Sequence, residues 1–248
     1  MSVLLLRLAG PLQAWGSAAR FPRRTTENAP TKSGVIGLLA GAQGRSREAD
    51  LSDLSSLRFG VRIDQPGTRL RDFQTAHHAD SGKAMPLSER FYLADAVFVA
   101  GVEGDAELVE ELHAAVREPT FLPYLGRRSC PPAQPIDLGI RANTDLKSAL
   151  LQTNWQASDW HQRRARAAAM AAASRSAPAR PPTIRLDLLI DCAPDEDPDI
   201  TQRDQPISFD PRHRRYGLRD LTSHAVHLPV AQAAEPPHHD PIAALRKT

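Results

Sequence analysis

The stretch "ENAPTKSGVIGLLAG", residues 27–41, sets the order of the first elements, because it predicts a helix directly after a strand and a loop. Thr31 or Ser33 can cap this helix, which is expected to end near Gln43. Upstream, the short apolar run at 2–8 predicts a buried first strand. The beginning of the chain therefore predicts a strand, a long polar loop and a helix.

Strand and helix patterns continue to alternate beyond this helix. In chain order they predict a strand at 57–64, its hairpin partner at 68–78, one or two strands at 90–102, a helix capped by Asp105, and a strand at 121–129 that runs into a loop. With an insert near 65–95, this is the element order of a ferredoxin-like (RRM-like) split βαβ fold. The expected fold class is α+β.

The remaining sequence divides the chain into further parts. We expect a ferredoxin-like domain at 1–150, a helix and Pro-rich linker at 151–182, a small C-terminal β part at 183–230, and a mobile tail at 231–248. Two strands, at 183–191 and 224–230, are expected within the C-terminal β part.

Charge is distributed unevenly, although the formal net charge is only +2. Residues 1–47 contain seven Lys or Arg and a single acid, Glu27. Further basic clusters lie at Arg127 and Arg128, at 163–166 and at 212–219. Such asymmetry is typical of a surface that faces a polyanion, whereas each cluster alone could be an ordinary solvated face.

Several protein classes are disfavoured by the same composition. Two cysteines, Cys130 and Cys192, without CxxC spacing argue against a disulfide framework and a structural zinc site. The first ten residues lack the regions of a secretory signal, and no apolar run approaches 18 residues. We therefore expect a cytoplasmic protein without a membrane segment, metal or cofactor.

The Lys32–Ser33 pair before the first helix raises the question of a nucleotide-binding P-loop. That motif needs Gly one and six residues before its Lys, where this chain has Thr31 and Thr26. The P-loop interpretation is therefore rejected. The helix N-terminus could still hold one phosphate with help from Lys32, although taken alone it is better explained as a well-capped helix.

Glycines at 34, 37, 41 and 44 share one face of this helix. Each interior Gly costs a helix about 1 kcal/mol relative to Ala. A bare stripe opposite the apolar face therefore predicts close approach of RNA, a partner subunit or another loop of this chain. Gly44 could simply be the C-terminal cap.

Four stretches together resemble the CasD subunits of type I-E CRISPR Cascade complexes, in the RAMP superfamily. They are "LRLAGPLQAWG" at 6–16, "RRTTENAPTKSGVIGLLAG" at 23–41, "YLGRRSCPP" at 124–132 and "SFDPRHRRYGLRD" at 208–220. The resemblance implies a ferredoxin-like palm with an inserted β-hairpin thumb and a reduced C-terminal part. It also implies a subunit for antiviral defence that binds the 5′ handle of CRISPR RNA and caps one end of Cascade. The implied partners are CasC backbone subunits, the large subunit CasA, and target DNA through the complex.

Residue types along these stretches fit a single-stranded RNA end, which needs cations, hydroxyl groups and a few base contacts. The family pattern places the 30–34 helix start and the 126–129 loop beside the handle. The candidate RNA-binding residues are Gln13, Trp15, Arg23, Arg24, Thr25, Thr26, Thr31, Lys32, Ser33, Gly34, Arg71, Gly126, Arg127, Arg128 and Ser129. Trp15 is more easily explained as a core or subunit-contact residue, and Arg71, Asp72 and Gln74, around the base of the thumb, are weaker candidates.

Two further expectations concern the mode of binding and the absence of catalysis. With 5% aromatic residues and no RNP1 motif, RNA binding should depend less on base stacking than in an RNA-recognition domain. Some relatives in other subtypes cut repeat RNA, and His77, His78, Lys83 and Tyr92 could supply acid–base groups. Nine histidines make an accidental pair unsurprising, and in the I-E branch a different subunit, CasE, cuts. We expect no catalytic residues here.

Overall fold

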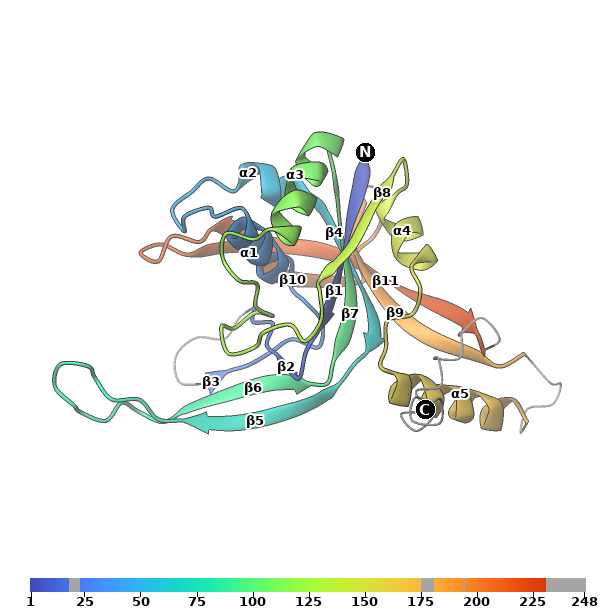
Figure 1. Ribbon diagram of the computed structural model, residues 1–248, viewed down its shortest axis with the longest axis horizontal. Coiled ribbons are helices and arrows are strands. Elements are labelled where there is room, and N and C mark those ends of the chain that lie inside the picture. Colours follow the sequence, from blue (N-terminus) through green and yellow to red (C-terminus); the bar gives the residue numbers. More distant parts are fainter. Residues whose placement is uncertain (18–22, 175–180, 194, 231–248) are drawn as a thin grey trace, which may run out of the picture. The chain divides into compact units, whose positions relative to one another are not determined.

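The computed structural model describes residues 1–17, 23–174, 181–193 and 195–230 of the 248-residue chain (Figure 1). The described residues form two compact units, one within Met1–Ala157 and Leu186–Val226, and the other made of 158–174, 181–185 and 227–230. The first unit contains a seven-stranded sheet in the order β10-β11-β9-β4-β7-β1-β8. It also contains a smaller sheet, in which β6 pairs with β2, β3 and β5.

The large sheet is built around β1 (Ser2–Ala9) and β7 (Val97–Gly104), both almost entirely buried. β7 pairs with β4 (Arg58–Gln65), β1 pairs with β8 (Asp137–Ala142), and all neighbouring pairs among these four strands are antiparallel. The helix α1 (Lys32–Ala42) and the short α2 (Ser52–Ser56) connect β1 to β4, while α3 (Ala106–Arg117) connects β7 to β8. The expected α+β class is confirmed.

The two faces of this sheet are covered by different helices. Phe59 and Val61 of β4 belong to the same apolar core as α1 and α3. On the opposite face, a Cβ added at Gly60 would lie 2.9 Å from a Leu150 methyl group, so α4 (Leu146–Gln152) packs directly on the backbone. Arg62 points to this second face, where it is fully buried and forms a bidentate ion pair with Asp64.

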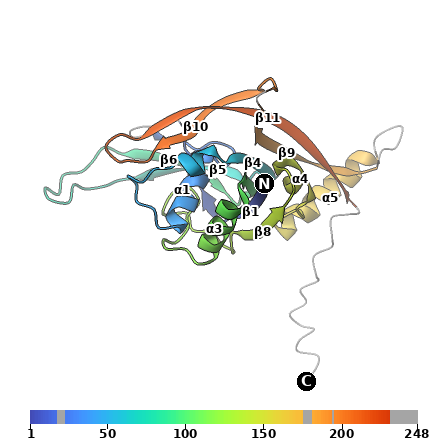
Figure 2. The ribbon, with the colours of Figure 1, turned by 90° about the horizontal axis from the view of Figure 1, so that it is seen from above.

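The C-terminal strands extend the same sheet. β9 (Thr183–Asp191) pairs with β4, and the hairpin of β10 (Ile200–Ser208) and β11 (Arg215–Pro229) continues beyond β9 (Figure 2). Both strands expected at 183–191 and 224–230 are present, and residues 183–230 add to the large sheet instead of forming a sheet of their own. The expected mobile tail from residue 231 lies outside the described residues.

The second unit contains α5 (Asp159–Ala173), which fills most of the Ala-rich stretch and has no buried residue. In this unit the Val230 N–H donates a hydrogen bond to the Pro182 carbonyl at 3.1 Å, which joins the residue before β9 to the residue after β11. Within the described ranges, no helix combines the length and apolar character needed to cross a bilayer.

Two predicted strands were assigned wrongly. The segment at 68–78 contains β5 (Thr68–Gln74), which pairs with β6 (Ser88–Ala94) and not with β4, because β7 and β9 occupy both edges of β4. Gly67, with a φ of +71°, turns the chain out of the large sheet. The segment at 121–129 has no strand, because Pro123 and the left-handed Gly126 interrupt an extended backbone.

Candidate nucleic-acid interface

The smaller sheet gathers most of the predicted RNA-binding arginines. β5 pairs along one edge of β6, while β2 (Leu12–Gln13) and β3 (Arg23–Arg24) pair along the other. The β5–β6 hairpin projects away from the large sheet (Figure 1). Because side chains alternate along a strand, the two faces of this sheet carry different sets of side chains.

The first face carries arginines stacked on aromatic rings. The Arg23 guanidinium lies 5.5 Å from the Phe91 ring centroid, and the Arg71 guanidinium lies 4.6 Å from that of Phe73. Both arginines pair with the carboxylate of Glu89, Arg23 at 3.8 Å, and their side chains are 71% and 52% exposed. Each guanidinium is therefore held in place while most of its surface remains accessible.

The opposite face is built on Tyr92, whose side chain is buried. The Arg127 guanidinium lies 4.8 Å from the Tyr92 ring centroid, and its Nη2 donates to the Arg24 carbonyl at 2.9 Å. Arg127 thus connects the 124–130 loop to β3 and β6. Arg24 itself is exposed.

The 124–130 loop is fixed by backbone contacts. The Leu125 N–H donates to the Cys130 carbonyl at 2.7 Å, and the Leu125 carbonyl accepts from the Ala14 N–H at 3.1 Å. Gly126 passes so close to Ala14 that a Cβ there would lie 1.8 Å from its carbonyl oxygen. Arg128 and Ser129 are exposed at the loop surface, so the loop presents them beside Arg127.

The loop after β1 is mostly internal. Gln13 is fully buried and donates to the carbonyls of Leu8 and Ala96, at 3.0 and 2.7 Å, while its Oε1 accepts from Trp15 Nε1. Trp15 is also fully buried, which agrees with its interpretation as a core residue. Thr26 is buried and accepts from the Trp15 N–H through Oγ1, and Thr25 is half-buried. These mostly buried side chains therefore support the Arg23–Arg24 segment from the interior of the protein.

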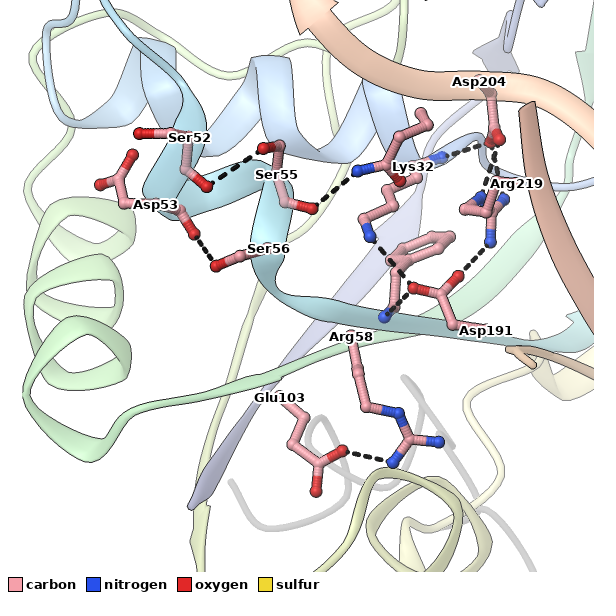
Figure 3. Close-up of polar contacts among 12 residues, drawn as sticks. Lys32, Ser52, Asp53, Ser55, Ser56, Arg58, Glu103, Asp191, Asp204 and Arg219 are labelled. Atoms are coloured by element: carbon pink, nitrogen blue, oxygen red, sulfur yellow. Dashed lines mark hydrogen bonds and ion pairs between the residues drawn. The ribbon is translucent and has the colours of Figure 1, made fainter. Parts of the chain in front are cut away.

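The N-terminus of α1 is already occupied by a carboxylate of this chain. The Lys32 N–H donates to Asp204 Oδ2 at 2.7 Å (Figure 3). Thr31 caps the helix by accepting from the Gly34 N–H at 3.2 Å. The expected free phosphate site is therefore filled by Asp204 in this structure. Thr31 and Ser33 are both buried.

Lys32 differs most from the exposed cation that was expected. Its side chain is 5% exposed, and its ammonium pairs with Asp191 Oδ2 at 3.1 Å. Arg219 completes the cluster, donating to Asp191 at 2.6 Å and through two nitrogens to Asp204 at 2.7 Å each. Burial lowers the pKa of Lys32, and Asp191 opposes this effect. The cluster of Lys32, Asp191, Asp204 and Arg219 ties α1 to β9, β10 and β11.

The glycine stripe of α1 is approached by other parts of this chain. A Cβ at Gly34 would lie 2.8 Å from the Trp15 ring, and one at Gly37 would lie 3.6 Å from the Phe209 ring. Gly41 has open space beside it. Gly44 follows the C-cap residue Gln43 with a φ of +77°. Of the three alternatives for the stripe, close approach of the same chain explains Gly34 and Gly37.

Of the residues considered for acid–base catalysis, His77 and His78 lie at the opposite end of the β5–β6 hairpin from Tyr92. His77 and His78 lie at the exposed tip of the β5–β6 hairpin, where His77 Nδ1 contacts the Gly82 carbonyl and His78 Nδ1 accepts from the Asp80 and Ser81 N–H groups. Tyr92 lies near the other end of β6, opposite Leu70 of β5. Asp72 and Gln74 hydrogen bond to each other on β5.

Sequence reasoning missed two features of this region. Arg90 was not selected, yet β6 places it directly opposite Arg24. Asp191 and Asp204 were not recognised as partners of Lys32, because they lie 159 and 172 residues away in the chain. The Arg-dense stretch at 210–220 forms the end of the β10–β11 hairpin, where Arg212, Arg214 and Arg215 are exposed and Arg219 is buried.

Comparison with known proteins places these features in a family. Residues 3–222 match the family model described as CRISPR-associated protein (Cas5). The chain is 38% identical over 171 residues to the CRISPR system Cascade subunit CasD of Escherichia coli K12, covering 60% of this chain and 76% of that one. A crystal structure of a Cas protein matches with a TM-score of 0.68 at 34% identity, over 95% of this chain and 99% of that one. A chain of a CRISPR RNA-guided surveillance complex matches with a TM-score of 0.73 at 29% identity, over 99% and 98%.

Proposed function

Because the chain belongs to the Cas5 family of CRISPR-associated proteins, we propose that it is a non-catalytic, RNA-binding subunit that holds the 5′ handle of a guide RNA and caps one end of a Cascade complex. The family membership confirms the resemblance to CasD subunits and a role in CRISPR defence. The RNA contact and the capping position are the proposed part.

In this proposal, the four central antiparallel strands with α1 and α3 are the ferredoxin-like palm, and the β5–β6 hairpin is the inserted thumb. The connection order β1-α1-β4-β7-α3-β8 with spatial order β8-β1-β7-β4 supports this assignment. Residues 1–150 would form the palm and thumb. Residues 151–182 would link them to the strands at 183–230.

The observation that carries the RNA-binding proposal is the concentration of accessible guanidinium groups on the smaller sheet and the adjoining loop. Arg23, Arg24, Arg71 and Arg128 are exposed there, and Arg127 is half-buried beside them. Arginines provide charge for phosphates and flat faces for bases, which suits a single-stranded RNA end. The buried Gln13, Trp15, Thr26, Thr31, Lys32 and Ser33, with the half-buried Gly34, would act by fixing the segment that presents these groups.

Other surfaces are proposed for protein partners. The exposed Arg212, Arg214 and Arg215 at the β10–β11 turn lie on a different sheet from the RNA-facing arginines, which suits a contact with a neighbouring subunit. CasC backbone subunits and the large subunit CasA are the expected neighbours. Target DNA would be reached through pairing with the guide RNA in the assembled complex.

A direct test measures binding of the purified full chain to labelled CRISPR RNA, with and without its 5′ handle, across a salt series. We expect handle-dependent binding that weakens with salt, since each neutralised phosphate adds about 0.7 to the slope of log K against log salt for a single strand. Replacing Arg127 and Arg128 by Glu should reduce both the affinity for RNA and the salt slope. Replacing Arg163 and Arg164, two consecutive exposed arginines on α5, by Glu is the matched control and should change neither.

The same samples also test the alternatives. Unchanged RNA affinity after reversal of Arg127 and Arg128, together with failed assembly into Cascade, would mean that this loop contacts protein. Cleavage of the RNA that is lost in His77→Ala or His78→Ala would overturn the non-catalytic assignment and make the chain a processing endoribonuclease. Intact RNA in all lanes is the expected result.

A further inference from the structure

The two faces of the smaller sheet differ in how their arginines are neutralised. On the Phe91 face, Arg23 and Arg71 share the carboxylate of Glu89. On the Tyr92 face, Arg24, Arg90 and Arg127 form no ion pair with any described residue of the chain. On one face a carboxylate pairs with both arginines, whereas on the other the three arginines form no ion pair within the part of the chain that the structure describes.

Backbone pairing brings these three residues to one place. Arg24 lies directly opposite Arg90 in the β3–β6 pairing. Arg90 and Tyr92 are two residues apart on β6 and so point to the same face, and Arg127 stacks on Tyr92 and donates to the Arg24 carbonyl. Arg23, the neighbour of Arg24, reaches Phe91 on the other face, which agrees with this alternation.

Unsatisfied donors point to a missing acceptor at this cluster. The Nη1 atom of Arg127 and the Nε atom of Arg90 are both inaccessible to solvent and have no hydrogen-bond partner. A buried donor of a charged group without an acceptor is costly, and so is the proximity of like charges. A phosphate of RNA, with several acceptor oxygens, would offset the like charges and offer acceptors to guanidinium groups that turn toward it.

We propose that Arg24, Arg90 and Arg127 form a phosphate subsite on the Tyr92 face of β6, and that Arg90 is a phosphate-binding residue of this chain. The occupant is an internucleotide phosphate of single-stranded RNA, so this inference rests on the proposed RNA-binding function. Asp72 faces the same side from β5, opposite Arg90, and is not close enough to any of the three arginines to form an ion pair. The strand of RNA passes on the Tyr92 side at this point.

The test compares the full wild-type chain with Arg90→Gln and Arg90→Lys, using labelled handle-containing CRISPR RNA across a salt series. Arg90→Gln should weaken binding about ten-fold or more and reduce the salt slope by about 0.7, the value for one phosphate of a single strand. Arg90→Lys keeps the charge but loses the fork, so affinity should fall several-fold with an unchanged slope. Arg141→Gln, on β8 at the far edge of the large sheet, removes the same charge and should have no effect.

The outcomes separate the two proposals. If Arg90→Gln binds the RNA with the same affinity and the same salt slope as the wild-type chain, the phosphate subsite is overturned and the RNA-binding proposal stands. Absence of handle-dependent binding by the folded wild-type chain would overturn both. If Arg90→Gln fails to fold, Arg90→Lys decides alone, because wild-type affinity in that variant would show that the guanidinium makes no bidentate contact.

Discussion

Replacing Asp204 by Asn is expected to lower the free energy of unfolding by about 3–5 kcal/mol, the usual cost of leaving a buried charge without its partner. Asp204 is fully buried and accepts from two nitrogens of Arg219 and from the Lys32 N–H. When Asp204 loses its charge, the two cations Lys32 and Arg219 have Asp191 as the remaining anion of the cluster. Urea unfolding followed by circular dichroism measures the change.

A double-mutant cycle tests whether the lost charge balance is the cause. Adding Arg219→Gln to Asp204→Asn leaves Lys32 and Asp191 as a neutral pair. The double variant should therefore be less destabilised than the sum of the two single variants, with a coupling energy of about 0.5–3 kcal/mol. Strict additivity would contradict the assignment of these residues to one electrostatic cluster.

The Arg45–Asp53 pair provides the control, because it has similar chemistry in a more solvated place. Its side chains are 23% and 40% exposed. Asp53→Asn should change the free energy of unfolding by less than about 1 kcal/mol, as for most surface ion pairs. A comparable loss in Asp204→Asn and Asp53→Asn would mean that burial does not determine the energetics of Asp204.

Local patterns in the sequence were sufficient for the helices and most strands. The α3 helix begins after Asp105, as predicted, because that carboxylate accepts from the Glu107 N–H at 3.0 Å, a contact within one helical turn. The α1 helix likewise follows from Thr31 and the apolar positions after it. Such elements depend on residues a few positions apart, which a sequence shows directly.

Long-range pairing was not predictable in the same way. Nothing near Lys32 indicates that Asp191 and Asp204 will reach it, so a buried lysine was interpreted as an exposed one. The register of β3 on β6, which places Arg24 opposite Arg90, is equally invisible in the local sequence. The arginine pair at 127–128 was selected from its motif, and the structure places Arg128 at the surface and Arg127 half-buried beside it. The surface position of a candidate residue was therefore predictable where local sequence determines it, and not where a side chain depends on distant strands.

The second large effect is expected at Gly126, whose substitution by Ala should destabilise the chain by about 2–5 kcal/mol. Two costs combine there. The residue has a φ of +82°, which L-residues with a Cβ rarely adopt, and the added Cβ would lie 1.8 Å from the Ala14 carbonyl oxygen. That oxygen belongs to backbone packed beside the buried Trp15 and cannot move away. The 124–130 loop must therefore move. Thermal and urea unfolding measure the loss.

Gly139→Ala isolates the backbone cost from the steric one. Gly139 has nearly the same φ, +84°, but the nearest atom to an added Cβ is Arg141 Nη1 at 3.9 Å. This variant should lose only about 1–2 kcal/mol and keep RNA affinity. Gly126→Ala, assayed at a temperature where both variants are folded, should also weaken handle binding about ten-fold, because displacement of the loop removes Arg127 from Tyr92 and from the Arg24 carbonyl. Equal stability and equal RNA affinity of the two variants would show that the loop accommodates a side chain without moving, and that its contact with Ala14 does not position Arg127.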